Sequence, residues 1–236
     1  MRSFRFVKII LQLAILFTFV GGTKAATILW SFSNADGSYD VAGSGTPVNF
    51  TPGIFDVGNT NGTIATLFNT SSASITYTPR SGTYNIGNAV LNGTFEATTS
   101  TYYTVTLTPA PGFAVRLSDF DFGVRSVTNG ASSYALRSSI DNYTTDILPS
   151  VGSITPTTAS AWAYKNNTFT AITAPDSSPV TLRLYMFGAI GNNPGTVNTR
   201  IDDVSIVATA VAIPEPGVVC SLMSLAVVAL TLRRRS

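Results

Sequence analysis

Short runs in which apolar and polar residues alternate constrain the fold of this chain most. In residues 103–107 the apolar side chains alternate with threonine, and residues 120–124 and 180–186 show the same period of two. This period turns one face of a strand towards a core. No stretch between residues 26 and 213 sustains the 3.6-residue period of a helix, so the chain is predicted to be all-β.

Turn-forming pairs separate these runs and indicate how the strands assemble. Asn-Gly or Pro-Gly pairs begin at positions 61, 92, 111, 129 and 194. Further strands are expected at 27–32, 63–67, 74–78, 133–139 and 168–173. Many short strands at this spacing predict a two-sheet antiparallel β-sandwich, jelly-roll-like, over residues 26–207, followed by a short tether at 208–213. No internal repeat or interior linker is visible, so one domain is expected.

The first 25 residues have the layout of a secretory signal peptide. Three basic residues, Arg2, Arg5 and Lys8, precede an apolar stretch at 9–20, and small residues lead up to Ala25. This pattern predicts export through the secretion machinery and cleavage by signal peptidase after Ala25. The alternative is a retained N-terminal membrane anchor.

The end of the chain combines a short motif, an apolar run and a basic stop: Pro214, Glu215 and Pro216, then residues 217–232, then Arg233, Arg234 and Arg235. The sixteen residues of the uncharged run would form a helix of about 24 Å, somewhat shorter than a hydrocarbon core of about 30 Å. Snorkelling arginines can close this gap and hold their end in the cytoplasm. A transmembrane helix at 217–232 is therefore predicted, and the plain alternative is an ordinary tail anchor.

The order of these three parts resembles the PEP-CTERM sorting signal of Gram-negative bacteria, here residues 214–236. The resemblance implies that an exosortase, a membrane-embedded peptidase, removes the tail. The protein would then pass from an inner-membrane-anchored intermediate to the cell surface or extracellular matrix. Members of that family often carry Ser or Thr and then an aromatic residue after the motif, whereas this chain has Gly-Val-Val-Cys at 217–220.

The segment between the two ends lacks the residues of many catalytic sites. The chain has no histidine, and its single cysteine, Cys220, lies in the tail. Histidine-dependent triads, Cys-His pairs and histidine zinc sites are therefore excluded. Residues 26–213 hold seven basic and eleven acidic residues, a net charge of −4, which argues against nucleic acid as a partner.

A second, looser resemblance concerns residues 134–141 and 200–204, which are similar to carbohydrate-binding-like jelly rolls that precede PEP-CTERM tails. It implies a non-catalytic structural or adhesive component associated with exopolysaccharide. One alternative is a carbohydrate-binding module with a defined glycan site. The other is a glycan-cleaving enzyme with two carboxylates, for which the segment offers a single glutamate, Glu96.

Two pairs of side chains are candidates for glycan contacts. Trp162 and Tyr164 lie in a polar stretch, and Arg183 and Tyr185 project from the face of their strand opposite its apolar ridge. Aromatic rings can stack on sugars while a hydroxyl adds a hydrogen bond. The alternative for the second pair is a central strand whose two faces are both covered.

The final strand is predicted to contain a β-bulge. The apolar residues from Val204 onward share one face, yet Ile201 falls on the opposite parity. A bulge at Asp202 and Asp203 would return Ile201 to the core and turn one carboxylate outward.

Acidic residues at two places raise a calcium hypothesis, the one cofactor considered for this chain. Asp36 and Asp40 follow the first strand, and terminal strands of a jelly roll often lie side by side. They could therefore join Asp202 and Asp203 as oxygen ligands. The favoured alternative is that these carboxylates cap turns and pair with Arg200.

Overall fold

The computed structural model describes residues 25–33, 47–59, 61, 67–68, 84–158, 161–191 and 195–214. Residues Ala25–Ile213 form one compact unit. Nearly all of the predicted signal peptide and sorting signal lies outside the described residues, which include Ala25 and Pro214. Within the described part of the chain, no helix is long and apolar enough to span a membrane.

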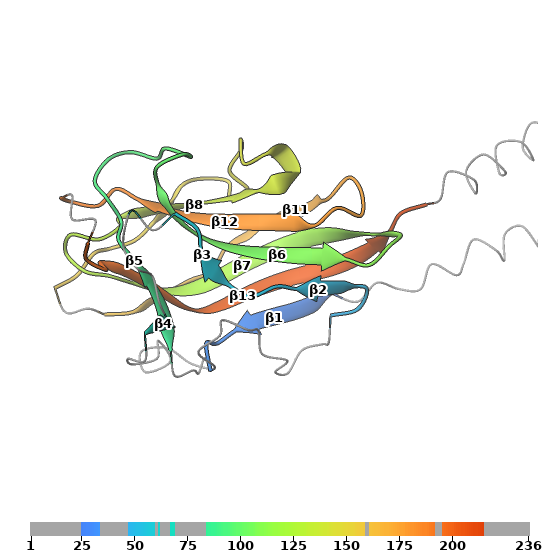
Figure 1. The fold of residues 1–236 in the computed structure, drawn as a ribbon, viewed down its shortest axis with the longest axis horizontal. Helices are drawn as coiled ribbons and strands as arrows, with labels where there is room; N and C mark the ends of the chain where they lie inside the picture. Colours follow the sequence, from blue (N-terminus) through green and yellow to red (C-terminus); the bar gives the residue numbers. More distant parts are fainter. Residues whose placement is uncertain are drawn as a thin grey trace, which may run out of the picture. The chain divides into compact units, whose positions relative to one another are not determined.

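Two antiparallel sheets form the fold (Figure 1). The first sheet has the order β10-β7-β13-β5-β4, with β1 paired to β13 and β11 paired to β7. Its strands are β1 (Ala26–Trp30), β4 (Leu67–Phe68), β5 (Asn85–Asn88), β7 (Phe113–Ser126), β10 (Ala163–Lys165), β11 (Thr168–Thr173) and β13 (Thr199–Ala212). The long β7–β13 pair is the central strand pair of this sheet.

The second sheet has the order β2-β6-β12-β8-β9, with β3 also paired to β6. Its strands are β2 (Phe50–Pro52), β3 (Asp56–Val57), β6 (Thr101–Pro109), β8 (Ser133–Ser138), β9 (Gly152–Ser153) and β12 (Val180–Phe187). A short 3-10 turn, η2 (Ser139–Asp141), follows β8. Strand β12 is central, since β6 and β8 flank it on either side.

The alternating runs place their apolar residues in the core as predicted. Every second residue of β6 is buried, and the inward faces of β7 and β12 join it in one continuous core. Aromatic rings pack against one another in this core. The ring centroids of Phe122 and Tyr134 lie 5.0 Å apart in an edge-on arrangement, and those of Phe55 and Tyr103 lie 6.3 Å apart in a stacked one. The prediction of an all-β, two-sheet antiparallel sandwich is confirmed, and the jelly-roll assignment stays a prediction.

Several strands differ in extent from their predicted ranges. The strand expected at 27–32 is β1 (Ala26–Trp30), and those expected at 63–67 and 74–78 fall almost entirely outside the described residues. The expected tether at 208–213 is mostly strand, because β13 continues to Ala212 and pairs with β7 as far as Phe113. Small buried residues, Ala208 and Ala210, let this end of β13 stay on the core.

The predicted bulge in the last strand is present. The register of β13 against β7 shifts between Asp202 and Ser205, and Asp203 has a φ of 48°. Ile201 and Val204 consequently both face the core. The prediction that one carboxylate turns outward is wrong: Asp202 and Asp203 are both fully buried, and one oxygen of Asp202 accepts the Asp203 amide at 2.8 Å.

Candidate functional site

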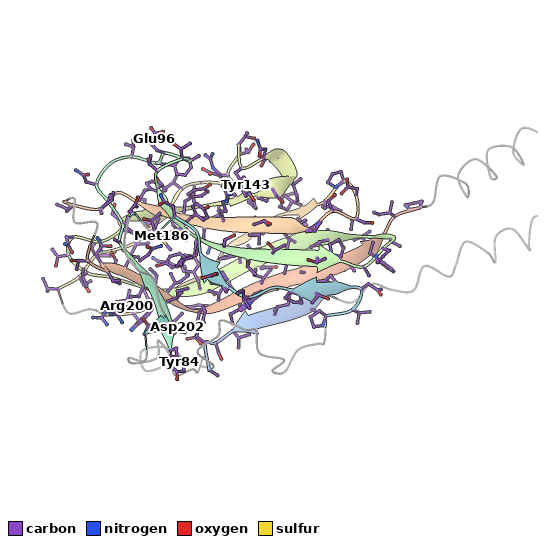
Figure 2. All side chains as sticks on the ribbon, viewed as in Figure 1. Tyr84, Glu96, Tyr143, Met186, Arg200 and Asp202 are labelled. Atoms are coloured by element: carbon purple, nitrogen blue, oxygen red, sulfur yellow. The ribbon has the colours of Figure 1, made fainter. Side chains whose placement is uncertain are left out.

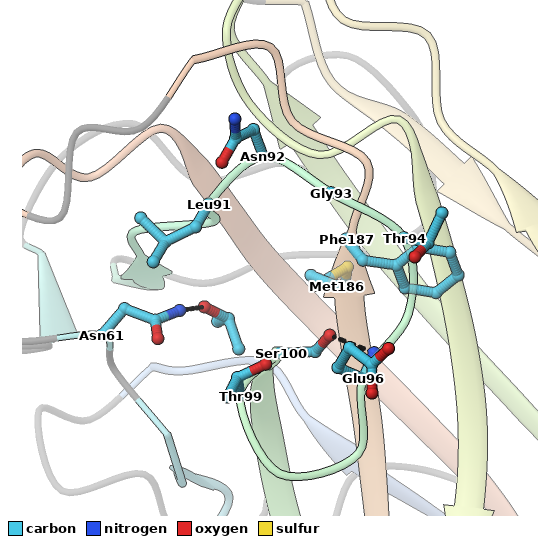
Figure 3. A pocket seen from close by; sticks show the side chains of 11 residues that line it. Asn61, Leu91, Asn92, Gly93, Thr94, Glu96, Thr99, Ser100, Met186 and Phe187 are labelled. Atoms are coloured by element: carbon cyan, nitrogen blue, oxygen red, sulfur yellow. Dashed lines mark hydrogen bonds between the residues drawn. The ribbon is translucent and has the colours of Figure 1, made fainter.

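A polar hollow of about 300 Å³ lies where β12 ends and β6 begins (Figure 3). Three separate segments form it: the loop after β3, the loop between β5 and β6, and the last residues of β12. Its lining is Asn61, Leu91, Asn92, Gly93, Thr94, Glu96, Thr99, Ser100, Thr101, Met186 and Phe187. Figure 2 shows Glu96 on the outer loop and Met186 on the strand below it.

The loop between β5 and β6 is fixed to the end of β12. The Gly188 amide donates to the Gly93 carbonyl at 3.0 Å, and Asn92 forms a parallel bridge with Ala189. Gly93 has a φ of 116°, a conformation that side chains with a Cβ rarely adopt. The loop therefore crosses the end of β12 at Gly93, and main-chain hydrogen bonding holds it there.

A tight turn fixes the backbone of Glu96, the residue that brings a carboxylate to the hollow. The amides of Thr99 and Ser100 both donate to the Glu96 carbonyl, at 3.1 and 2.8 Å. In return the Glu96 amide donates to the Ser100 hydroxyl at 3.0 Å. The turn fixes the backbone of Glu96 while its side chain stays exposed to solvent.

Asparagine side chains from the loop after β3 brace the other side of the hollow. The Asn59 amide group donates to the Thr99 carbonyl at 2.7 Å, and the Asn61 amide group donates to the Thr101 hydroxyl at 2.5 Å. Thr101 in turn donates to the Ala89 carbonyl at 2.5 Å. Asn61 has a φ of 49°, which asparagine tolerates better than most residues.

The lining suits binding of a small polar molecule. It combines two amide side chains and four hydroxyls with an apolar part made by Leu91, Met186 and Phe187. Among the described lining residues, Glu96 is the one that carries a charge. Small-molecule sites commonly pair apolar walls with a few placed polar groups.

The outer face of β12 is covered by an arginine–aromatic cluster, the residues Phe95, Tyr102, Arg137, Tyr143, Arg183, Tyr185 and Phe187. The Arg183 guanidinium lies 3.7 Å from the centroid of Tyr143 and 4.6 Å from that of Tyr102. It also donates to the Tyr185 hydroxyl at 3.3 Å. Tyr185 is fully buried, so the alternative of a covered central strand describes its position, and it offers no open surface for a glycan. Arg183 is partly exposed.

Arg137 links this cluster to the hollow. Its guanidinium lies 4.1 Å from the centroid of Phe95, and its Nε bonds Asp146 at 2.7 Å. Phe95 packs edge-on against Phe187 at 5.5 Å, and Phe187 lines the hollow. The cluster therefore supports the loop that carries Glu96.

The other predicted glycan pair lies on the other sheet. Tyr164 belongs to β10 and faces Gly123 of β7 across the strand pair, and Trp162 comes just before β10. Both side chains are partly exposed. Because β10 and β12 belong to different sheets, the structure does not join the two predicted pairs into one site.

The described residues form no site that supports the calcium hypothesis. Asp36 and Asp40 lie outside the described residues, and among the residues that are described no group of three or more His, Cys, Asp or Glu could hold a metal ion. Arg200 donates to the Asn85 side chain at 3.2 Å and lies directly opposite Arg125 in the β7–β13 pair. Burial, and next the charge of Arg125, lowers the pKa of Arg200.

The sorting residues can be placed only in part. Ala25 and Pro214 are exposed at the two ends of the sandwich chain, while Glu215, Pro216, Arg233, Arg234 and Arg235 lie outside the described residues. The hollow itself was not predicted, because its lining comes from loops without periodicity. The Asn92-Gly93 turn and the lone Glu96 were the available signals.

The fold and the hollow define the class of the molecule: an all-β sandwich with a polar surface depression. No family model matches the chain, and no curated protein matches it either. Two adhesin domains of Lys-gingipain from Porphyromonas gingivalis W83 are similar structures. The K3 domain is 16% identical to this chain, the match covers 68% of this chain and 92% of K3, and the TM-score is 0.33. The K1 domain is also 16% identical, the match covers 79% of this chain and 98% of K1, and the TM-score is 0.37.

An isomalto-dextranase from Arthrobacter globiformis T6, complexed with panose, is also similar. It has 9% identity, a coverage of 78% of this chain and 32% of that chain, and a TM-score of 0.38. These values are too low to carry an argument about function.

Proposed function

We propose that this chain is an exported cell-envelope protein with a non-catalytic, adhesive or structural role in an exopolysaccharide matrix. Its tail, residues 214–236, would be processed by an exosortase-type peptidase after the signal peptide is removed at Ala25. The support is the arrangement of the sequence: two segments with the character of targeting signals flank one folded unit, Ala25–Ile213. The jelly-roll-like topology belongs to the same proposal.

The observation that carries the binding role is the chemistry of the hollow. Hydroxyl and amide groups of the kind that bond sugar hydroxyls surround an apolar floor of Met186 and Phe187. Hydrolysis by the usual glycosidase mechanism needs two carboxyl groups about 5 to 9.5 Å apart. Of the described residues that line this hollow, Glu96 alone carries a carboxylate, so their composition favours binding over cleavage.

The test is retention by the polysaccharide. The purified protein is mixed with exopolysaccharide from a producing bacterium and sedimented, and the polymer is then checked for newly released reducing ends. We expect the protein to sediment with the polymer and to leave its length unchanged. Protein that stays in the supernatant would contradict the matrix role, and released sugar ends would contradict the non-catalytic one.

A carbohydrate-binding module with a defined site is the second candidate, and the hollow is the observation that favours it. A glycan array distinguishes it from a general matrix protein, because a module would select a few oligosaccharides. Trp162→Ala serves as the comparison variant at the β10 side of the other sheet. Loss of array binding in this variant would show that the glycan site lies near Trp162 and not in the hollow.

A further inference from the structure

We propose that the hollow between the β5–β6 loop and the end of β12 is a subsite for an amino sugar, a pyranose ring that carries a protonated amine. This inference rests on the proposed function, since it names the sugar class for the same site. It assigns Glu96 to the amine and the surrounding hydroxyls and amides to the ring hydroxyls.

The charge of the lining selects the sugar class. Glu96 is exposed and, among the residues that the structure describes, it forms no ion pair and no lysine or arginine lines the hollow. A sugar carboxylate bound here would lie beside a like charge without a cation to compensate it. An ammonium group would instead meet an unpaired carboxylate, so the hollow discriminates between basic and acidic sugars.

The size and the polar groups fit one or two sugar rings. The volume of about 300 Å³ lies at the lower end of the range for ligand pockets. Hydroxyls of Thr94, Thr99 and Ser100 can both donate and accept, which matches the mixed hydrogen bonding of a sugar. The half-buried Phe187 offers apolar area for the C–H face of a ring.

The site is held in shape before any ligand arrives. Its loop is fixed by the Gly188–Gly93 main-chain bond, by the turn around Glu96 and by the Asn59 side chain. Phe187 is held from the other side by the edge-on ring of Phe95. Loops that are already ordered lose less conformational freedom on binding, which preserves affinity in a small site.

The experiment is a calorimetric titration of the full chain in detergent with three trisaccharides: glucosamine, N-acetylglucosamine and galacturonate trimers. We expect the glucosamine trimer to bind most tightly, the neutral trimer more weakly and the acidic trimer not measurably. Because the ion pair between Glu96 and the amine would be exposed to solvent, Glu96→Gln should lower the affinity for the glucosamine trimer by about two- to five-fold. The same variant should leave the neutral trimer unchanged.

Asp176→Asn is the matched control, because Asp176 is an exposed carboxylate before the start of β12, at the opposite end of that strand from the hollow. It should change none of the three titrations. Equal binding of the glucosamine trimer by wild type and Glu96→Gln would overturn the inference, and so would preference for the acidic trimer or no binding at all. If the protein still sediments with exopolysaccharide in that case, the proposed function stands and the subsite fails. Trimer binding without sedimentation would instead support the subsite and contradict the matrix role.

Discussion

Replacing Arg183 by methionine tests whether the arginine–aromatic cluster holds the loops on the outer face of β12. Arg183 lies between the rings of Tyr143 and Tyr102, at 3.7 and 4.6 Å from their centroids. Tyr143 has a φ of 60°, which is unfavourable for a bulky residue and must be compensated by its surroundings. Methionine keeps the apolar stem but removes the charge and the hydrogen bond to Tyr185.

The magnitude follows from these contacts. Each cation–π contact at a partly exposed site contributes about 0.5–1 kcal/mol, and the hydrogen bond to the buried Tyr185 hydroxyl contributes about 1 kcal/mol. Against these gains, the Arg183 Nε is buried without a hydrogen-bond partner, and its removal recovers about 1 kcal/mol of desolvation. The free energy of unfolding should therefore fall by about 1–2 kcal/mol, a loss in melting temperature of about 2–4 °C per kcal/mol.

A double-mutant cycle with Tyr143→Leu isolates the pairwise contact, measured by denaturant unfolding. Leucine keeps the unfavourable φ and removes the aromatic face together with the hydroxyl, while Tyr143→Phe is the control that removes the hydroxyl alone. We expect a coupling energy of about 0.5–1 kcal/mol between Arg183 and Tyr143. Strict additivity of the two single variants would refute the claim that the stacked pair holds this loop.

Three further changes probe other parts of the structure. Burial acts to raise the pKa of Asp141, but hydrogen bonds from Thr145 and Thr144 outweigh it and lower the pKa; the stability that Asp141 contributes is present above its unfolded pKa and lost as the pH falls through the folded one. Asp141→Asn should therefore be less stable than wild type at pH 7, and in acid-titrated unfolding the difference should vanish as the pH falls below the folded pKa of Asp141. Tyr103→Phe removes the bond from a fully buried hydroxyl to a β13 carbonyl at 3.2 Å and should cost about 1 kcal/mol in urea unfolding; an unchanged midpoint would contradict that bond. Gly130→Ala would push a Cβ into a main-chain carbonyl and should cost about 1–3 kcal/mol, whereas Gly195→Ala enters open space and should stay within about 0.5 kcal/mol; equal thermal shifts in the two variants would show that the packing around Gly130 is looser than described.

The strands with strict alternation could be predicted from the sequence because burial follows residue parity directly. Residues 103–107, 120–124 and 180–186 all turn their apolar faces inward. Even the bulge near Asp203 could be predicted, since Ile201 could reach the core only if the parity changed once. Local periodicity is therefore enough to predict which face of these strands points into the core.

What could not be predicted depends on contacts between distant segments. Parity places Tyr185 on the outer face of its strand and leaves open whether that face is covered; Phe95 and Tyr102 from other segments pack against it at 5.1 and 5.2 Å. The two buried carboxylates of the bulge are a similar case, because parity says which face a side chain takes but not what covers it. The hollow draws on three loops and strand ends, so no single stretch of sequence carries its pattern.

The most direct test of the account is the fate of the full chain in a bacterium that has an exosortase and in its deletion strain. A tag placed just after Ala25 reports the size and location of the protein in each. The account predicts a shortened form at the surface or in the matrix that disappears in the deletion strain and on Glu215→Ala. An unprocessed protein held in the inner membrane of both strains would contradict it and make the tail a plain anchor.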